Sequence, residues 1–150
     1  MMFKTHLAIG VFLTLLFLPI VSFNKFLFVG VLLICTFLPD IDMSRSYMGK
    51  YKIFRPLQWT VKHRGFFHSF TLAVVLAIIF AFYIPILALP FFLGYAGHLI
   101  GDALTPEGIR PFWPSKNEIK WKIRTGGKTE KMIFYLLILA SVVLLVRLFV

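Results

Sequence analysis

The residues best suited to chemistry in this chain are its histidines and aspartates, which gather in four short islands at the ends of apolar segments. Because the mean hydropathy of the chain is +0.87, such groups are costly near hydrocarbon unless each has a partner, a proton or a metal. A metal site in a membrane protein is therefore the leading interpretation. The candidate ligands are every His and every Asp of the chain: His6, Asp40, Asp42, His63, His68, His98 and Asp102.

The spacing inside two islands indicates how they could bind a metal. His98 and Asp102 are four positions apart, so on a helix both side chains project from one face and can share an ion. A simple His–Asp hydrogen bond would have the same spacing. Asp40 and Asp42 could bridge two ions, or one could bind while the other orients a histidine. Such a pair also commonly caps a helix, so the two aspartates alone leave these roles open.

The other histidines are less regularly placed. His63 and His68 are five positions apart, which is about 140° around a helix, so we expect His63 to precede the helix that begins near His68. His6 by itself would be an ordinary interfacial histidine. Arg64, beside His63, could contact a phosphate oxygen, or it is one more basic residue of a cytoplasmic loop.

The ligand types narrow the choice of metal and of reaction. Imidazole and carboxylate without a thiolate favour a divalent ion, first of all zinc, with manganese or iron as alternatives. One zinc needs about four ligands, so the candidates hold either two ions or one ion with further groups that orient ligands or transfer protons. Two ions about 3.5–4 Å apart would suit phosphoester cleavage. A carboxylate that is not a ligand, such as Asp42, could then act as the base.

The composition indicates one membrane-embedded domain over residues 1–150. The chain is 59% hydrophobic and includes 18 Phe, whereas a soluble globule is about 45–50% apolar. The single cysteine, Cys35, excludes an internal disulfide. A net charge of +10 would suggest nucleic acid in a soluble protein, but basic membrane loops explain it, so no nucleic acid is expected. The oligomeric state is left open.

Apolar segments predict an all-α, polytopic membrane protein with about four to five transmembrane helices. The second segment is short for a full span, and the uncharged break near Pro85 and Pro90 predicts a tight helical hairpin. Alternating apolar and basic residues over 119–124 predict a short strand. The five expected helices cover about residues 7–21, 26–38, 66–84, 86–104 and 132–150.

The basic residues predict the orientation in the membrane. If all five segments cross, every Lys and Arg except Lys25 and Arg147 lies on one side. The positive-inside rule then places the N-terminus and both basic loops, 43–62 and 105–131, in the cytoplasm of a multi-pass inner membrane protein. All four islands are expected at that face, where anionic lipid is a natural partner.

Glycines and glutamates have simpler expected roles. Gly97 and Gly101 have the small-xxx-small spacing that permits close helix approach. We expect them, with Gly94, to bring the island of the fourth segment near its neighbours. The glutamates in or beside the second loop are expected to be solvated; they are Glu107, Glu118 and Glu130.

The islands, in this order, resemble the YdjM-like family of LexA-regulated, membrane-bound, metal-dependent hydrolases. The chain departs from the family at Phe67, where a Thr is usual, and at Gly97, where a Ser is usual; each change removes a hydroxyl beside a site histidine. The matching stretches are 5–10, 38–42, 63–69 and 94–106, continued by Gly108, 112–114 and 125–127 with Glu130.

The resemblance implies a fold distantly similar to the helical zinc-dependent phospholipases C and single-strand nucleases. It implies as ligands His6, Asp40, His63, His68, His98 and Asp102, with Asp42 as a ligand or an orienting carboxylate.

Three functions are compatible with these observations. The first is a phospholipase-like hydrolase that cleaves a phosphoester of a lipid or lipid-linked substrate at the cytoplasmic face, with Asp42 and Arg64 as catalytic residues. The second is a non-enzymatic ion or proton carrier, which the nearly apolar outer halves of the segments disfavour. The third is a stress-response membrane module whose metal cluster only ties helix ends together.

Overall fold

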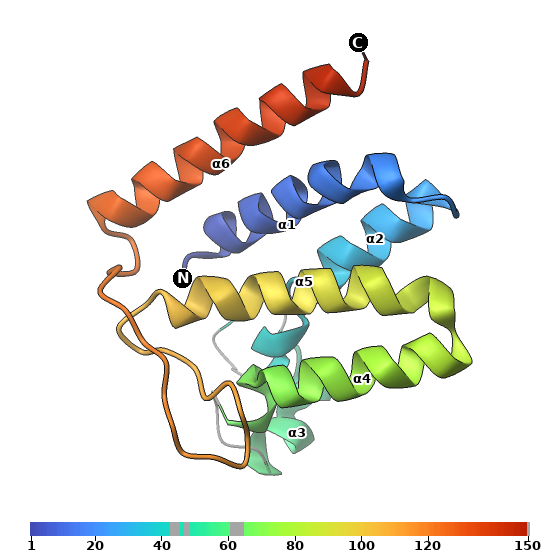
Figure 1. Ribbon diagram of the computed structural model, residues 1–150. Coiled ribbons are helices and arrows are strands. Elements are labelled where there is room, and N and C mark those ends of the chain that lie inside the picture. Colours follow the sequence, from blue (N-terminus) through green and yellow to red (C-terminus); the bar gives the residue numbers. More distant parts are fainter. Residues whose placement is uncertain (43–45, 47–48, 61–64, 150) are drawn as a thin grey trace.

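The structure, a computed structural model, describes the chain except residues 43–45, 47–48, 61–64 and 150. Five apolar helices lie side by side with roughly aligned axes (Figure 1). They are α1 (Phe3–Phe17), α2 (Lys25–Cys35), α4 (Phe70–Tyr83), α5 (Pro85–Ala103) and α6 (Lys128–Arg147). The connections contain α3 (Arg55–Thr60) and the 3-10 turns η1 (Leu18–Ile20), η2 (Leu38–Asp42), η3 (Lys52–Phe54) and η4 (Phe66–His68). The all-α prediction is confirmed.

Helix length separates the elements that can cross a membrane from those that are shorter. In the described chain, three helical segments are long and apolar enough to span: Phe3–Ile20, Pro85–Ala103 and Lys128–Arg147. Helix α4 is apolar but has only 14 residues. Helix α2 has 11 residues, or about 16 Å of helix, roughly half of a hydrocarbon core. The prediction of a helical membrane protein is confirmed, with a second segment as short as its sequence indicated.

Helix α5 is the centre of the packing, because it contacts α1, α2 and α4, whereas α6 lies along α1. The predicted hairpin is present: only Ile84 separates α4 from α5, and Pro85 begins α5. The core around α5 is built from Phe91, Tyr95 and Leu99, each at most 2% exposed. This burial holds the last turns of α5 in a defined position.

The glycines of α5 provide close contact, as the sequence predicted. A Cβ at Gly94 would lie 2.3 Å from the backbone oxygen of Leu32, so α2 approaches α5 backbone to backbone. A Cβ at Gly97 would meet side chains of α1, and one at Gly101 would lie 3.1 Å from Cε1 of His6. The glycine face of α5 therefore admits both α2 and the histidine of α1.

The predicted strand over 119–124 is wrong. Among the described residues, this part of the second loop forms only a single antiparallel bridge, between Ile109 and Ile119. The N–H groups of Trp121 and Ile123 donate instead to carbonyls of the turn that follows α5. The period-two pattern therefore reflects an extended segment that is tied to a helix end by alternate N–H groups, not a strand in a sheet.

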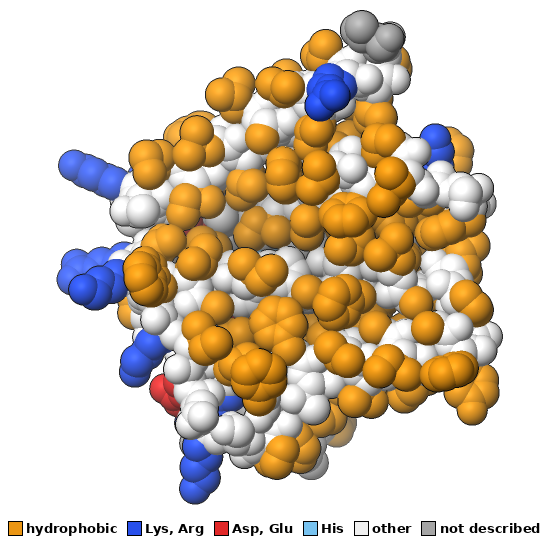
Figure 2. Space-filling view, in the orientation of Figure 1, with side chains coloured by type: hydrophobic (Ala, Val, Ile, Leu, Met, Phe, Trp, Pro, Cys, Tyr) orange, Lys and Arg blue, Asp and Glu red, His pale blue; other side chains and the backbone are white. Residues whose placement is uncertain are grey.

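Most of the helix ends that carry the polar islands lie toward one end of the molecule, on the left in Figure 1. Helices α1, α4 and α6 begin toward that side and α5 ends there, whereas the shorter α2 runs toward it and ends nearer the middle of the view. Figure 2 shows Lys and Arg side chains gathered along this end and apolar side chains covering the helices. An apolar surface of this extent suits contact with lipid.

Candidate metal centre

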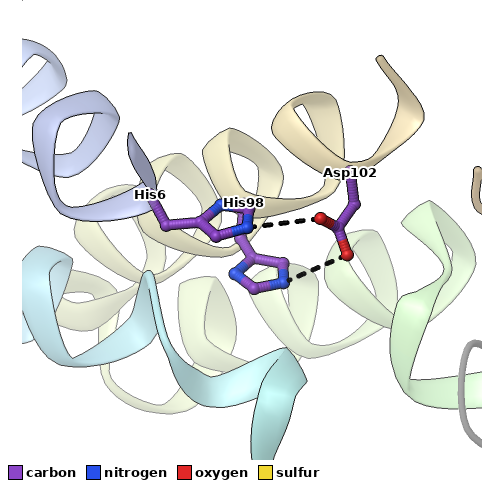
Figure 3. A group of neighbouring side chains, drawn as sticks. All are labelled: His6, His98 and Asp102. Atoms are coloured by element: carbon purple, nitrogen blue, oxygen red, sulfur yellow. Dashed lines mark ion pairs between the residues drawn. The ribbon is translucent and has the colours of Figure 1, made fainter. Parts of the chain in front are cut away.

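The candidate metal centre is a cluster of His and Asp side chains, and two of them come from the last turns of α5. Nε2 of His98 and Oδ2 of Asp102 lie 3.7 Å apart. His6, in the first turns of α1, reaches the other oxygen of the same carboxylate, with Nε2 3.2 Å from Oδ1. Figure 3 shows both rings directed toward Asp102, and the two rings stack with centroids 3.9 Å apart. Two helices thus bring two imidazoles to one carboxylate.

His68 of η4 and Asp40 of η2 complete the group. Nε2 of His68 lies 3.8 Å from Oδ1 of Asp40 and 3.7 Å from Oδ2 of Asp102. Nε2 of His98 lies 3.6 Å from the same Asp40 oxygen. A tetrahedral zinc with bonds of about 2.0–2.1 Å separates its ligand atoms by about 3.3–3.4 Å. The ligand atoms of His68, His98 and Asp40 lie within 4.8 Å of one another, so a small contraction would let two nitrogens and one oxygen bind one ion.

Two trios of residues can each bind one ion, because the ligand atoms within each trio lie within 4.8 Å of one another. The trios are His6, His98 and Asp102, and Asp40, His68 and His98. Because His98 belongs to both, the five residues form one cluster. The described part of the chain therefore has buried His and Asp groups that can hold a metal ion, and the geometry leaves the identity of the ion open.

The second nitrogen of His98, Nδ1, faces a backbone carbonyl on the side of the ring away from the cluster. Nδ1 lies 2.8 Å from the backbone oxygen of Thr36, and because a carbonyl only accepts, Nδ1 carries the proton. When the ring is neutral, Nε2 presents its lone pair to the Asp40 and Asp102 oxygens, and it has no hydrogen-bond partner among the described residues. A lone pair facing two carboxylates is unfavourable unless a cation or a proton lies between them, so the donor set fits a divalent metal.

Asp42 lies behind His68. Its Oδ2 is 3.3 Å from Nδ1 of His68, the ring nitrogen opposite the one that faces the cluster, and its side chain is buried. A carboxylate in this place fixes the orientation of a metal-binding imidazole.

Asp40 is the accessible carboxylate of the cluster. Its side chain is 26% exposed, whereas that of Asp102 is 3% exposed. Burial is the main cause that raises the pKa of Asp40, and His6 and His68 oppose the increase. Its backbone oxygen accepts a hydrogen bond of 2.5 Å from the Ser46 hydroxyl, so the first loop helps to hold η2 in place.

The backbone on either side of His68 is held by two hydroxyls. The Tyr95 hydroxyl of α5 donates to the Phe67 oxygen at 2.5 Å. Ser69 caps α4 and donates to the Phe66 oxygen at 2.7 Å. These bonds fix η4 against α5, which places the His68 ring beside His98.

Glu130 is buried at 0% exposure, so the prediction that it is solvated is wrong. Its Oε1 accepts the N–H of Met2 at 2.7 Å and its Oε2 accepts the N–H of Gly126 at 2.6 Å. These two hydrogen bonds satisfy the buried carboxylate, and the bond to Met2 connects α6 to the start of α1. The amine of Met1 in turn donates to Oδ1 of Asp102 at 2.7 Å.

Sequence reasoning therefore named most, but not all, of the residues gathered here. Among its candidate ligands, the structure brings together His6, Asp40, Asp42, His68, His98 and Asp102. His63 and Arg64 lie outside the described residues. Thr36 was missed, because its contact with His98 is made by a backbone oxygen that the residue type does not reveal. Nothing local in the sequence marked the contact of Glu130 with Met2, because the two residues are 128 positions apart.

Comparisons with known proteins give one matching family and several relatives. The family model described as YdjM inner membrane protein matches residues 1–149. The inner membrane protein YdjM of Escherichia coli (strain K12) and that of Shigella flexneri are each 35% identical over 119 residues, which is 70% of this chain and 60% of theirs. The uncharacterized protein YvsG of Bacillus subtilis (strain 168) is 29% identical over 144 residues, 92% of this chain and 90% of that protein. The chain thus matches about 60% of the length of the YdjM relatives. No solved structure matches it.

Proposed function

Because this chain belongs to the YdjM family of inner membrane proteins, we propose that its His/Asp cluster is the metal centre of a membrane-bound hydrolase. The proposed substrate is a phosphoester of a lipid or lipid-linked compound, cleaved at the cytoplasmic face. The supporting observation is the convergence of buried imidazoles and carboxylates from α1, η2, η4 and α5 at one end of the helices. Ionisable groups inside a membrane protein are expensive, and they commonly mark function.

The proposed ligands of the first ion are His68, His98, Asp40 and Asp102, with His6 on the second oxygen of Asp102. A divalent ion bound there, zinc in our proposal, would lower the pKa of a coordinated water and polarise a phosphoryl oxygen. The protein itself prepares the site, because a backbone carbonyl directs the proton of His98 away from the cluster.

The position of Asp42 supports one of its three proposed roles, which are ligand, orienting carboxylate and base. Its 3.3 Å approach to Nδ1 of His68 favours an orienting carboxylate over a ligand. A base role for Asp42 would then require the proton to pass through His68. The partial exposure of Asp40 supports substrate approach from the side of the first basic loop. Arg64 and His63, from the same loop, remain proposed as a phosphate contact and a further ligand.

A cluster that only ties helix ends together is the second candidate, and the burial of the ligands favours it. The side chains of His6, His68, His98 and Asp102 are all buried, as is common in closed structural sites. The two candidates differ in whether the loaded protein turns over a substrate.

The test is hydrolysis of a panel of phospholipids and lipid-linked phosphates by the full chain in detergent after loading with zinc. We expect turnover by the wild type, none by His98→Ala or Asp102→Asn, and unchanged turnover by Glu118→Gln, which alters an exposed carboxylate outside the cluster. Equal turnover in the wild type and both cluster variants would refute the assignment. Bound zinc without turnover of any substrate would favour the structural candidate.

A further inference from the structure

A cavity of about 490 Å³ lies between the first turns of α1 and α6. It contains none of the metal-ligand candidates. Aromatic and aliphatic side chains form most of its wall, and two lysines, one from each helix, add positive charge. The lining residues are Met2, Phe3, Lys4, Lys131, Phe134 and Tyr135.

The positive charge of this cavity is not neutralised by the described residues around it. Lys4 and Lys131 are both exposed, and neither forms an ion pair with a described carboxylate. Glu130 is next to Lys131 in sequence, but both of its oxygens accept backbone N–H groups. Two lysines on facing helix turns therefore leave room for an anion between them.

We propose that this cavity binds an anionic phospholipid, with the headgroup phosphate between Lys4 and Lys131 and the adjoining glycerol and acyl carbons against the aromatic wall. Both helices are long and apolar enough to span a membrane, so their first turns lie where headgroups meet hydrocarbon. Tyr135 and the lysine stems suit that boundary, because each has an apolar body and a polar tip. The volume is in the range of small-molecule sites, about 300–1,000 Å³, and a free phosphate would leave most of the wall uncovered.

A lipid bound here would join two elements that the buried Glu130 already connects. The cavity is lined by Met2, whose N–H donates to Glu130. It is also lined by Phe3 and Lys4 of the first turn of α1, which carries His6. Occupancy would therefore hold α6 against the start of α1. This inference concerns lipid binding alone, so it stands whether or not the His/Asp cluster is catalytic.

The experiment is native mass spectrometry of the full chain in detergent, titrated with phosphatidylglycerol and, separately, with phosphatidylcholine of the same chain length. We expect tighter binding of phosphatidylglycerol, weakened about fivefold by Lys4→Gln or Lys131→Gln and about 25-fold by both, since each lysine near an anionic headgroup contributes about that factor. The control is the double variant Lys25→Gln with Arg147→Gln. It removes the same charge from the opposite helix ends and should keep the affinity of the wild type.

Two further measurements make the outcome decisive. Phe134→Ala, which removes part of the wall but no charge, should weaken phosphatidylglycerol binding, and glycerol phosphate should compete poorly because it lacks acyl carbons. The proposal is overturned if phosphatidylcholine binds equally well, if the double lysine variant binds as the wild type does, or if glycerol phosphate displaces the lipid at equal concentration. Thermal unfolding of every variant checks that it is folded. The substitutions Lys4→Gln and Lys131→Gln should leave Tm unchanged, because both lysines are exposed.

Discussion

Helices α5 and α6 are similar in length and are both apolar enough to span a membrane, yet they have different places in the molecule. About half of α5 is buried against other helices, whereas most of α6 is exposed. Helix α5 packs against three helices, whereas the main packing partner of α6 is α1. Both could cross a bilayer, but only α5 supplies side chains to the cluster.

The difference between the two helices comes from their small and polar residues rather than from their hydropathy. Helix α5 has three glycines that admit its neighbours, and between them are His98 and other buried residues. In α6 the only buried residues are Glu130 and Ser141. In this protein, glycine spacing and ionisable residues identify the helix that packs, and an otherwise uniform apolar surface identifies the helix that faces lipid.

The largest difference between the two helices should appear when one leucine of each is truncated to alanine. Leu99 of α5 is 0% exposed and Leu139 of α6 is 62% exposed. We expect Leu99→Ala to lower the free energy of unfolding by about 2–5 kcal/mol, because it leaves a cavity, and Leu139→Ala to change it by less than about 0.5 kcal/mol. Thermal unfolding in one detergent measures both. Equal shifts in Tm would show that α6 is packed as tightly as α5.

A smaller effect should come from adding one methyl group at a helix contact. Gly94→Ala places a Cβ against the α2 backbone, which cannot rotate away, whereas a Cβ at Gly30 meets nothing within 4 Å. We expect Gly94→Ala to cost about 1–3 kcal/mol and Gly30→Ala to be neutral or stabilising by about 0.5–1 kcal/mol. Chemical denaturation gives both values. The close contact of α2 with α5 would be disproved if Gly94→Ala were as stable as the wild type.

The smallest effect should come from removing a hydroxyl. Tyr95→Phe on α5 loses the bond to the Phe67 oxygen and should cost about 0.5–1.5 kcal/mol. Tyr135→Phe on α6 is the matched change at a side chain that is 68% exposed, and it should leave Tm unchanged. If Tyr95→Phe also weakens metal retention while Tyr135→Phe does not, the bond positions His68; equal retention would confine its role to stability.

The sequence was sufficient to predict the helices and the end of the molecule where the ligands meet, because both depend on local pattern. Apolar runs mark helices, and the His98–Asp102 spacing places two ligands on one face. The extended segment at 119–124 was misread because its N–H groups pair with a helix end, and alternation along the chain does not reveal which backbone is the partner.

Other parts of the site could not be predicted because they depend on contacts between distant residues. The Thr36 oxygen that fixes the proton of His98 is a backbone atom 62 positions away, and any residue type offers one. The burial of Glu130 depends on the position of Met2 against α6. Residue types therefore identified the candidate ligands, whereas the contacts of Thr36 and Glu130 became visible only in three dimensions.

The most direct test of the account is the metal content of the purified full chain. Elemental analysis after exposure to zinc and removal of loosely bound ions should find at least one equivalent in the wild type and in Glu118→Gln. His98→Ala and Asp102→Asn should retain far less, with affinity lower by at least about a hundredfold, since even loss of an orienting partner costs about 10–100-fold. Treatment of the wild type with a chelator should lower Tm, because a bound ion stabilises the folded state. A folded wild type that retains no zinc, or cluster variants that retain as much as the wild type, would contradict the assignment of these residues to a metal centre.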